Sequence, residues 1–282
     1  MGTIKYLTPE EFRKLQLAQL PLIEELDRVC RKHDIKYTIA CGSLLGAVRH
    51  KGYIPWDDDA DVAMLRKDYE RFKAACAEEL DGSRFYFQDH ENTPGYRWGY
   101  GKLRRKDTVF LREHQEHMPY EQGVFVDVFP LDNVPDSKIG RTIWNFRCFC
   151  VRKVLWAPVG AIADTHALTR GLYGLLARIP ERRVKGRLNA LIRRAGSGSQ
   201  ACSRWVRILM YPTPTKDYGY LREWYASQAP IEFEGITFPG VSDADAYLSF
   251  KFGTWRQLPP QSQRKVHPVS AFKLPGMTEV RE

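Results

Sequence analysis

Four aspartates stand within five positions of this 282-residue chain, at Asp57, Asp58, Asp59 and Asp61. Carboxylates held so close repel one another, and a bound cation is the usual remedy in proteins. The apolar run 62–65 that follows is typical of a strand entering a core, so the acids stand at its leading end. Because alternate residues of a strand face the same way, we expect the carboxylates of Asp59 and Asp61 to meet at one point. The alternative is a plain acidic loop.

A fifth acid, Asp127, stands alone in the apolar segment 123–129. An unpaired carboxylate inside a sheet is costly to desolvate, so Asp127 either faces solvent or meets Asp59 and Asp61 from a neighbouring strand. The second interpretation predicts a site of three carboxylates. Carboxylate oxygens suit Mg²⁺, with Mn²⁺ as the alternative ion.

Gly42 and Ser43 follow a predicted strand at 37–40 and precede a helical turn at 44–49. A turn of this kind offers backbone N–H groups and a hydroxyl to a phosphate. The segment with Asp59 and Asp61 begins sixteen residues after Ser43. The two features together indicate phosphate chemistry more specifically than either does alone.

Short strands and amphipathic helices alternate along the chain. A helix is predicted to begin after Thr8, because Thr8 and Glu11 flank Pro9 in the pattern of a capping box. The strands are predicted at 59–65, 84–88, 98–104 and 123–129, with a hairpin at 231–238. The further helices are predicted at 67–80, 143–156, 168–194 and 243–252. This order indicates an α+β fold, a mixed sheet flanked by helices.

Basic residues gather in one segment of the chain. The net charge is +9, yet residues 138–207 hold 15 Lys or Arg against two acids, so the remainder is slightly acidic. The same segment is rich in aromatic and aliphatic residues at helical spacing. We therefore expect a catalytic core at 1–137, an inserted basic helical module at 138–207, and a C-terminal part at 208–282 that completes the catalytic domain.

The basic insert has three interpretations. It can lie on an anionic membrane, pack on the catalytic core with its arginines in solvent, or bind an anionic glycan or nucleic acid. Nucleic acid is not expected as a partner, because the charge excess is confined to the insert. The chain has no run of 18 apolar residues and no apolar signal core near its start. We expect a cytoplasmic protein with peripheral contact at the inner face of the plasma membrane.

Several stretches of the chain resemble the LicD family. They are 42–61, 102–104, 126–132, 233–239 and 252–260, and the similarity extends from about residue 7 to about residue 267. The resemblance implies a nucleotidyltransferase-like fold. It also implies transfer of phosphocholine, or a related phospho-substituent, from CDP-choline or another CDP-linked donor. The implied acceptor is a hydroxyl of a cell-surface polysaccharide or glycolipid precursor, such as a lipid-linked saccharide, and CMP leaves.

Phosphoryl transfer depends on charge neutralisation and alignment, and the chain offers both. Under the resemblance, Asp59, Asp61 and Asp127 hold Mg²⁺ on the diphosphate of the donor, and Asp127 shares the metal or accepts the proton of the attacking hydroxyl. The candidate substrate-binding residues are Gly42, Ser43, Arg49, His50, Lys51, Trp56, Lys102, Arg104 and His267. Each charged member has the alternative of a solvated surface charge.

The chain departs from the family pattern at two places. Pro268 follows His267 where the family often carries a second His, and Thr254 stands where an Asp is frequent. A choline head favours an aromatic cage through cation–π attraction. The aromatic residues available for a cage are Trp56, Tyr96, Trp98, Tyr100 and Trp255. Aromatic residues in such numbers more often belong to the core.

Two other functions compete with phosphocholine transfer. A nucleotidyltransferase moving NMP from an NTP to a small molecule or RNA would use the same acids, and a non-catalytic basic binding module would need none of them. The complete set of Asp59, Asp61 and Asp127 disfavours the binding module. The blocks at 54–57 and 258–260 favour transfer of a phospho-substituent over transfer of a nucleotide.

Overall fold

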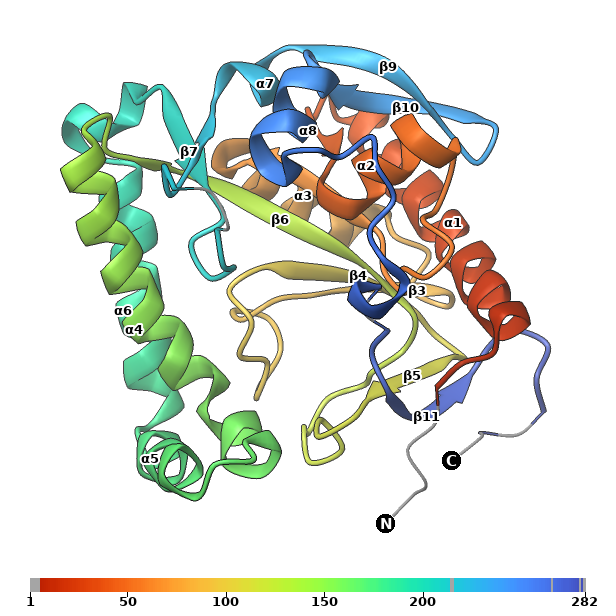
Figure 1. The fold of residues 1–282 in the computed structure, drawn as a ribbon, viewed down its shortest axis with the longest axis horizontal. Helices are drawn as coiled ribbons and strands as arrows, with labels where there is room; N and C mark the ends of the chain where they lie inside the picture. The colour runs from red at the N-terminus through yellow and green to blue at the C-terminus, as the bar shows by residue number, and fades with distance from the viewer. Residues whose placement is uncertain (1–5, 214–215, 265, 279, 281–282) are drawn as a thin grey trace.

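A mixed β-sheet runs through the computed structural model, which describes residues 6–213, 216–264, 266–278 and 280 (Figure 1). Its central strands follow the order β1-β2-β6-β4-β3. They span Thr38–Ile39 (β1), Asp61–Leu65 (β2), Phe85–Gln88 (β3), Gly101–Arg105 (β4) and Phe125–Val134 (β6). Strands β2 and β6 are parallel and the other pairs are antiparallel. The predicted α+β class with a mixed sheet is confirmed.

Helices α1 (Pro9–Lys32) and α3 (Arg66–Glu79) pack on each other and on the sheet. The predicted capping box is present, since the Glu11 N–H donates to Thr8 Oγ1 at 3.3 Å and the Thr8 N–H donates to Glu11 Oε2 at 2.8 Å. The apolar stripe of α1 is buried in the main core. Helix α2 (Cys41–His50) is longer than the predicted turn at 44–49, and it begins beside β2.

Three helices of the basic segment stand at one end of the sheet: α4 (Lys138–Ala163), α5 (Ala167–Ala177) and α6 (Glu181–Ala195) (Figure 1). The single helix predicted at 168–194 is wrong, because the chain breaks before Pro180, which disfavours helical backbone at the preceding residue. Helices α4 and α6 share a small apolar cluster with the end of β6 and residues 209–210. Among the described residues, no helix is both long and apolar enough to cross a bilayer.

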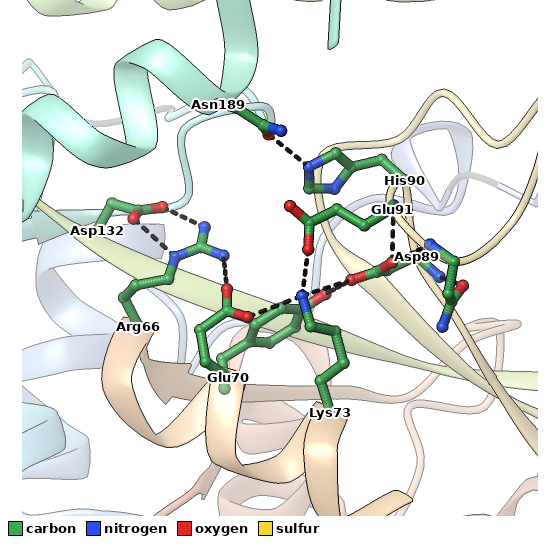
Figure 2. Close-up of polar contacts among 10 residues, drawn as sticks. Arg66, Glu70, Lys73, Asp89, His90, Glu91, Asp132 and Asn189 are labelled. Carbon is green, nitrogen blue, oxygen red and sulfur yellow. Dashed lines mark hydrogen bonds and ion pairs between the residues drawn. The ribbon is translucent and has the colours of Figure 1, made fainter. Parts of the chain in front are cut away.

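A polar network fastens these helices to the sheet (Figure 2). Arg66 of α3 donates to both oxygens of Asp132 near the end of β6, at 2.8 and 2.6 Å. His90 Nε2 lies 2.9 Å from Asn189 Oδ1 of α6, so the loop after β3 contacts the helical segment directly. The far end of β6 also pairs with β7 (Trp205–Arg207), and β7 pairs with β8 (Tyr220–Leu221).

The C-terminal part returns to the core at two places. The predicted hairpin is confirmed as β9 (Gln228–Phe233) and β10 (Ile236–Val241), joined by a turn in which Glu234 and Gly235 have φ values of 53° and 77°. It is flanked by α7 (Glu223–Ala226) and α8 (Ala244–Phe252), and α8 packs on α2. Strand β11 (Val269–Lys273) pairs with β5 (Val109–Arg112). Two short 3₁₀ helices span Gly198–Cys202 and Gln261–Gln263. The domain boundaries at 137/138 and 207/208 stay predictions.

Candidate active site

Three adjacent strands place an acid, an acid and a lysine side by side. Asp61 of β2 is the register partner of Asp127 on β6, and Lys102 of β4 is the register partner of Asp127 on its other side. Lys102 Nζ bonds Asp127 Oδ1 in the buried interior. The predicted meeting of the acids from neighbouring strands therefore occurs at the leading ends of β2 and β6.

Asp59 joins this pair from the loop just before β2. The strand begins at Asp61, so the expectation that Asp59 lies on the strand is wrong; it still reaches the same point. Asp59, Asp61 and Asp127 each offer one carboxylate oxygen, and these oxygens lie within 4.8 Å of one another. Hard oxygen ligands at such spacing suit one divalent cation.

The surroundings of Asp61 and Asp127 raise the pKa values of both carboxyl groups. Burial raises the pKa of Asp61 well above its usual range, and the nearby Asp59 charge raises it further. Burial also raises the pKa of Asp127, although Lys102 acts against it. Ionised carboxylates are therefore costly here without a positive charge, and the donor set fits a metal ion.

The start of α2 positions Asp61. The Gly42 N–H donates to Asp61 Oδ2 at 3.3 Å, and the Asp61 N–H donates to Ser43 Oγ at 2.8 Å. A Cβ at position 42 would lie 2.7 Å from Asp57 Oδ2, so the glycine leaves room for that carboxylate beside the start of α2. Gly42 and Ser43 are thus part of the site, next to the acids, as the spacing predicted.

Arg112 is a second cation at the acids and was not found from the sequence. Its Nη2 lies 3.1 Å from Asp58 Oδ1 and 3.0 Å from Asp59 Oδ2. Burial lowers the pKa of Arg112, but the attraction of Asp58 and Asp59 outweighs it and leaves the pKa raised. Burial lowers the pKa of Lys102 to about 8, although Asp127 favours its charged form.

Asp58 belongs to a different set of contacts from the three clustered acids. A second acidic group, Asp57, Asp58 and Asp59, has the same close spacing. However, Asp58 Oδ1 is also 3.0 Å from His267 Nδ1, in addition to its contact with Arg112. Burial raises the pKa of Asp58, yet Arg112 and His267 outweigh it and the pKa is lowered. Asp58 thus already has two cationic partners, which leaves the group with Asp127 as the candidate for a metal ion.

Two buried glutamines of α1 hold the acidic loop by its backbone. Gln16 Nε2 donates to the carbonyls of Ile54 and Asp57 at 3.0 and 3.1 Å, and Gln19 Nε2 donates to the carbonyl of Asp58 at 2.9 Å. The sequence reasoning missed both residues. A signal existed, because Gln16 and Gln19 are three apart and lie within the buried stripe of an amphipathic helix.

Other predicted site residues have different partners. Arg49 Nη1 donates to the Trp255 carbonyl at 2.8 Å and joins α2 to the C-terminal part. Arg104 donates to Gln88 Oε1 and to the Gly123 carbonyl, both at 2.7 Å. The guanidinium groups of Arg49 and Arg104 therefore both donate hydrogen bonds to other parts of the fold.

The remaining candidates lie around Trp56. Its ring is 6.1 Å from that of His50, and the Arg264 guanidinium stacks 4.2 Å from the Trp56 ring centroid. Lys51 is exposed at the end of α2, where its φ is 61°. Within the described part of the chain, His50, Lys51 and Trp56 form no hydrogen bond or ion pair with the clustered acids, so their roles stay predictions.

The aromatic residues considered for a choline cage divide into two groups. Tyr96 and Trp255 are buried in the protein interior. Trp98 and Tyr100 instead line a cavity of about 320 Å³ that Lys102, Arg112 and His267 also line. An open aromatic surface thus lies next to the cations of the site.

Comparison with known proteins agrees with the geometry. Residues 34–153 match the family model described as "LicD/FKTN/FKRP, nucleotidyltransferase domain". That range contains Gly42, Asp61, Lys102, Arg112 and Asp127, and ends before His267. Over 271 residues the chain is 24% identical to the lipopolysaccharide cholinephosphotransferase LicD of Haemophilus influenzae. The aligned region covers 91% of this chain and 96% of that protein.

Two shorter similarities come from Rickettsia. An uncharacterised protein of Rickettsia typhi is 42% identical over 60 residues, which is 21% of this chain and 19% of that protein. One from Rickettsia prowazekii is 44% identical over 55 residues, 20% of this chain and 21% of that protein. The predicted resemblance to the LicD family is confirmed over residues 34–153, which match the model of its nucleotidyltransferase domain.

Proposed function

We propose that the protein transfers phosphocholine, or a related phospho-substituent, from a CDP-linked donor to a hydroxyl of a cell-surface saccharide, with CMP leaving and Mg²⁺ required. The observation that carries this proposal is the cluster of Asp59, Asp61 and Asp127, with Lys102 paired to Asp127. The relative from Haemophilus influenzae is named a lipopolysaccharide cholinephosphotransferase, which supports both the transferred group and the saccharide acceptor. The order of the mixed sheet supports our interpretation of it as nucleotidyltransferase-like.

The chemistry requires one bond to form and one to break. The acceptor oxygen bonds to the phosphorus that carries choline, and the bond from that phosphorus to the oxygen of the leaving CMP breaks. The hydroxyl proton passes to a carboxylate, for which Asp127 is our candidate unless it serves only as a metal ligand. Mg²⁺, or Mn²⁺ as the alternative, supplies neutralisation of the diphosphate charge when bound.

The side chains of this protein divide the remaining work. Asp59 and Asp61 hold the metal ion, and the start of α2 keeps Asp61 in place through Gly42 and Ser43. Lys102 and Arg112 stabilise the negative charge that develops on the departing CMP. Preorganised cations stabilise such a charge most strongly where water is excluded.

We further propose a cytoplasmic protein with peripheral membrane contact through the outer face of the helical segment. The inner face of α4 packs in the small apolar cluster, yet α4 and α5 also expose apolar side chains. These are Ile143, Phe146 and Phe149 on α4, and Leu168, Leu172 and Leu175 on α5. Together with the +13 charge of residues 138–207, they suit an anionic lipid surface that carries the acceptor.

A donor screen tests the proposed reaction. The enzyme is incubated with Mg²⁺, a saccharide acceptor derived from lipopolysaccharide, and in turn CDP-choline, CDP-ribitol, CDP-glycerol and CTP. We expect CMP release from a CDP-linked donor. Release of pyrophosphate from CTP with no CMP from the CDP donors would instead support nucleotidyl transfer.

A further inference from the structure

A second cavity, of about 360 Å³, lies between helix α4 and the segment that precedes β4. It shares Trp98, Tyr100 and Trp156 with the cavity that Lys102 and Arg112 line. The two cavities are therefore neighbours that share these aromatic side chains. We call them the Arg152 lobe and the Arg112 lobe after the arginine that lines each.

The Arg152 lobe is cationic. Arg97, Arg152 and Lys153 line it, and none of the described residues around it is acidic. Arg97 is committed to the fold, since it donates to the carbonyls of Leu155 and Val154 at 3.1 and 3.3 Å, where Pro158 cannot supply the helical N–H. Lys153 Nζ bonds the Tyr173 hydroxyl at 2.7 Å.

Arg152 is the cation that retains a free donor. Its Nη1 is buried and has no hydrogen-bond partner among the residues that the structure describes. A buried donor left unpaired costs free energy, so an acceptor atom from a ligand would stabilise it. The same lobe therefore offers both a cavity and an unused guanidinium donor.

A second arginine adds to the positive charge behind the lobe. Arg207 of β7 is fully buried, and within the described part of the chain its Nε and Nη2 have no partner, while Nη1 donates to Asn145 at 3.2 Å. Burial lowers the pKa of Arg207, and the charge of Arg152 lowers it further although Cys148 acts against both. The charges of Arg207 and Arg152 therefore repel each other, which favours an anion near Arg152.

Aromatic rings complete the walls of the Arg152 lobe. The Trp98 and Trp156 ring centroids are 5.4 Å apart, and those of Tyr100 and Tyr211 are 6.2 Å apart. The apolar faces of a sugar ring pack well on such surfaces. Burial raises the pKa of Tyr211, and the Asp61 charge raises it further, so the lobe lies within electrostatic reach of the clustered acids.

We propose that the Arg152 lobe binds the acceptor as an anionic saccharide, with a phosphate or carboxylate of the saccharide paired to Arg152 and a sugar ring against Trp156. This inference rests on the proposed function, because it assigns the acceptor to one lobe and leaves the Arg112 lobe, with Lys102, for the diphosphate of the donor. Residues of the helical segment then select the acceptor, while residues on the sheet contact the reacting groups.

Binding measurements test this assignment apart from turnover. The probe is de-O-acylated lipopolysaccharide, used intact and after chemical removal of its phosphates, and titrated calorimetrically into the full chain with Mg²⁺. We expect Arg152→Gln to raise the Kd for the intact probe about tenfold, as expected for loss of a charge-assisted hydrogen bond. Arg152→Lys should give a smaller rise. The Kd for CDP-choline should stay within about twofold.

Arg147→Gln is the matched control, because Arg147 is exposed on the same helix and does not line the lobe. It should leave both Kd values unchanged. An unchanged Kd in Arg152→Gln, or no binding of the intact probe to the wild type, would each overturn the assignment. A phosphate-free probe that binds equally well to the wild type and more weakly to Arg152→Gln would support it with a carboxylate as the paired group. A wild type that binds the probe through Arg152 but releases no CMP from any CDP donor would overturn the proposed function and leave the anion site standing.

Discussion

Asp61 takes its position from three elements at once. Its own strand sets it opposite Asp127, and the start of α2 contacts both its carboxylate and its backbone N–H. The carboxylate is buried among other acids, so its charge does not stabilise the fold, and under the proposed function it would serve a bound cation. A substitution of this residue should therefore lower activity without lowering the stability of the fold.

We expect Asp61→Asn to reduce kcat/KM for CMP release from CDP-choline by at least about 10²-fold, the range for loss of one electrostatic stabiliser. The Tm of the metal-free protein should stay unchanged or rise, because the substitution removes one buried charge from a group of closely spaced acids. Steady-state kinetics and thermal denaturation with and without Mg²⁺ measure both quantities.

Asp245→Asn is the control, since Asp245 is exposed on α8 and pairs with Arg256. It should keep full activity and the rise in Tm that Mg²⁺ produces by binding the native state. Full activity in Asp61→Asn, or a Mg²⁺-dependent rise in Tm equal to that of the wild type, would remove the metal assignment.

The β9–β10 hairpin acts as a clamp on the acidic loop. Glu234 in its turn accepts two hydrogen bonds from Arg13 of α1, at 2.9 and 2.6 Å, and one from the Tyr53 N–H at 3.0 Å. The C-terminal part thus holds both α1 and the segment that leads to the acids. Residues 221 positions apart in the chain are joined by this contact.

Glu234→Ala should lower the free energy of unfolding by about 1–2 kcal/mol, the range for hydrogen bonds to a charged group at a partly exposed position. Activity should fall as well, because the loop before Asp59 loses a fixed end. Urea denaturation and CMP release report the two effects. Glu232→Ala, exposed on β9, should change neither, and equal losses in both variants would contradict a specific clamp.

The elements that the sequence predicted are those with a local pattern. The apolar run after Asp61 and the turn at Glu234 and Gly235 each have a clear periodicity or turn signal, and both occur as predicted. Strands β5, β7, β8 and β11 were missed, and each forms by pairing with another segment of the chain. Their existence depends on tertiary contacts rather than on local preference.

The same distinction holds for the site. Asp61 and Asp127 could be predicted as site residues because acids at strand spacing and a lone acid in an apolar run are local signals. Lys102 was predicted because it lies in a stretch that resembles the LicD family. Arg112 arrives on β5, whose pairing partner lies more than 150 positions later, so nothing near it in the sequence marked its role. Asp59 reaches the site from a loop, where strand alternation does not apply.

At the scale of the whole molecule, one polar network joins the sheet to the helical segment (Figure 2). Arg66 and Asp132 form its buried centre, with Asp132 only 1% exposed. Glu70 and Lys73 extend it along α3. Because β6 also carries Asp127, this network fixes the strand that links the acids to the small apolar cluster.

Asp132→Ala should lower the free energy of unfolding by about 3 kcal/mol, because it leaves a largely buried guanidinium with only the exposed Glu70 as partner. The double variant Arg66→Met/Asp132→Leu should recover much of that loss, since apolar side chains can replace a buried ion pair. Glu70→Ala, at an exposed position, should cost no more than about 1 kcal/mol. Chemical denaturation measures all three, and equal costs for Asp132→Ala and Glu70→Ala would contradict a central role for the pair.

The excess positive charge of the molecule lies in residues 138–207, and this predicts binding to anionic membranes. We expect sedimentation with vesicles rich in anionic lipid at low salt, and release as salt screens the basic segment. Leu172→Ser/Leu175→Ser should weaken this binding, because apolar contact from α5 is lost, while Leu258→Ser should not. Absence of binding at low salt would remove the membrane contact and leave the helices as a packed and solvated module.

The phosphorus that receives the acceptor oxygen is the most direct test of the proposed reaction. The enzyme, Mg²⁺, CDP-choline and the saccharide acceptor are followed by ³¹P NMR, with Asp61→Asn as the inactive comparison. We expect one new phosphodiester that carries choline on the saccharide and one equivalent of CMP. Free phosphocholine together with a saccharide that carries CMP would contradict the account, because it would show nucleotidyl transfer at the same acids.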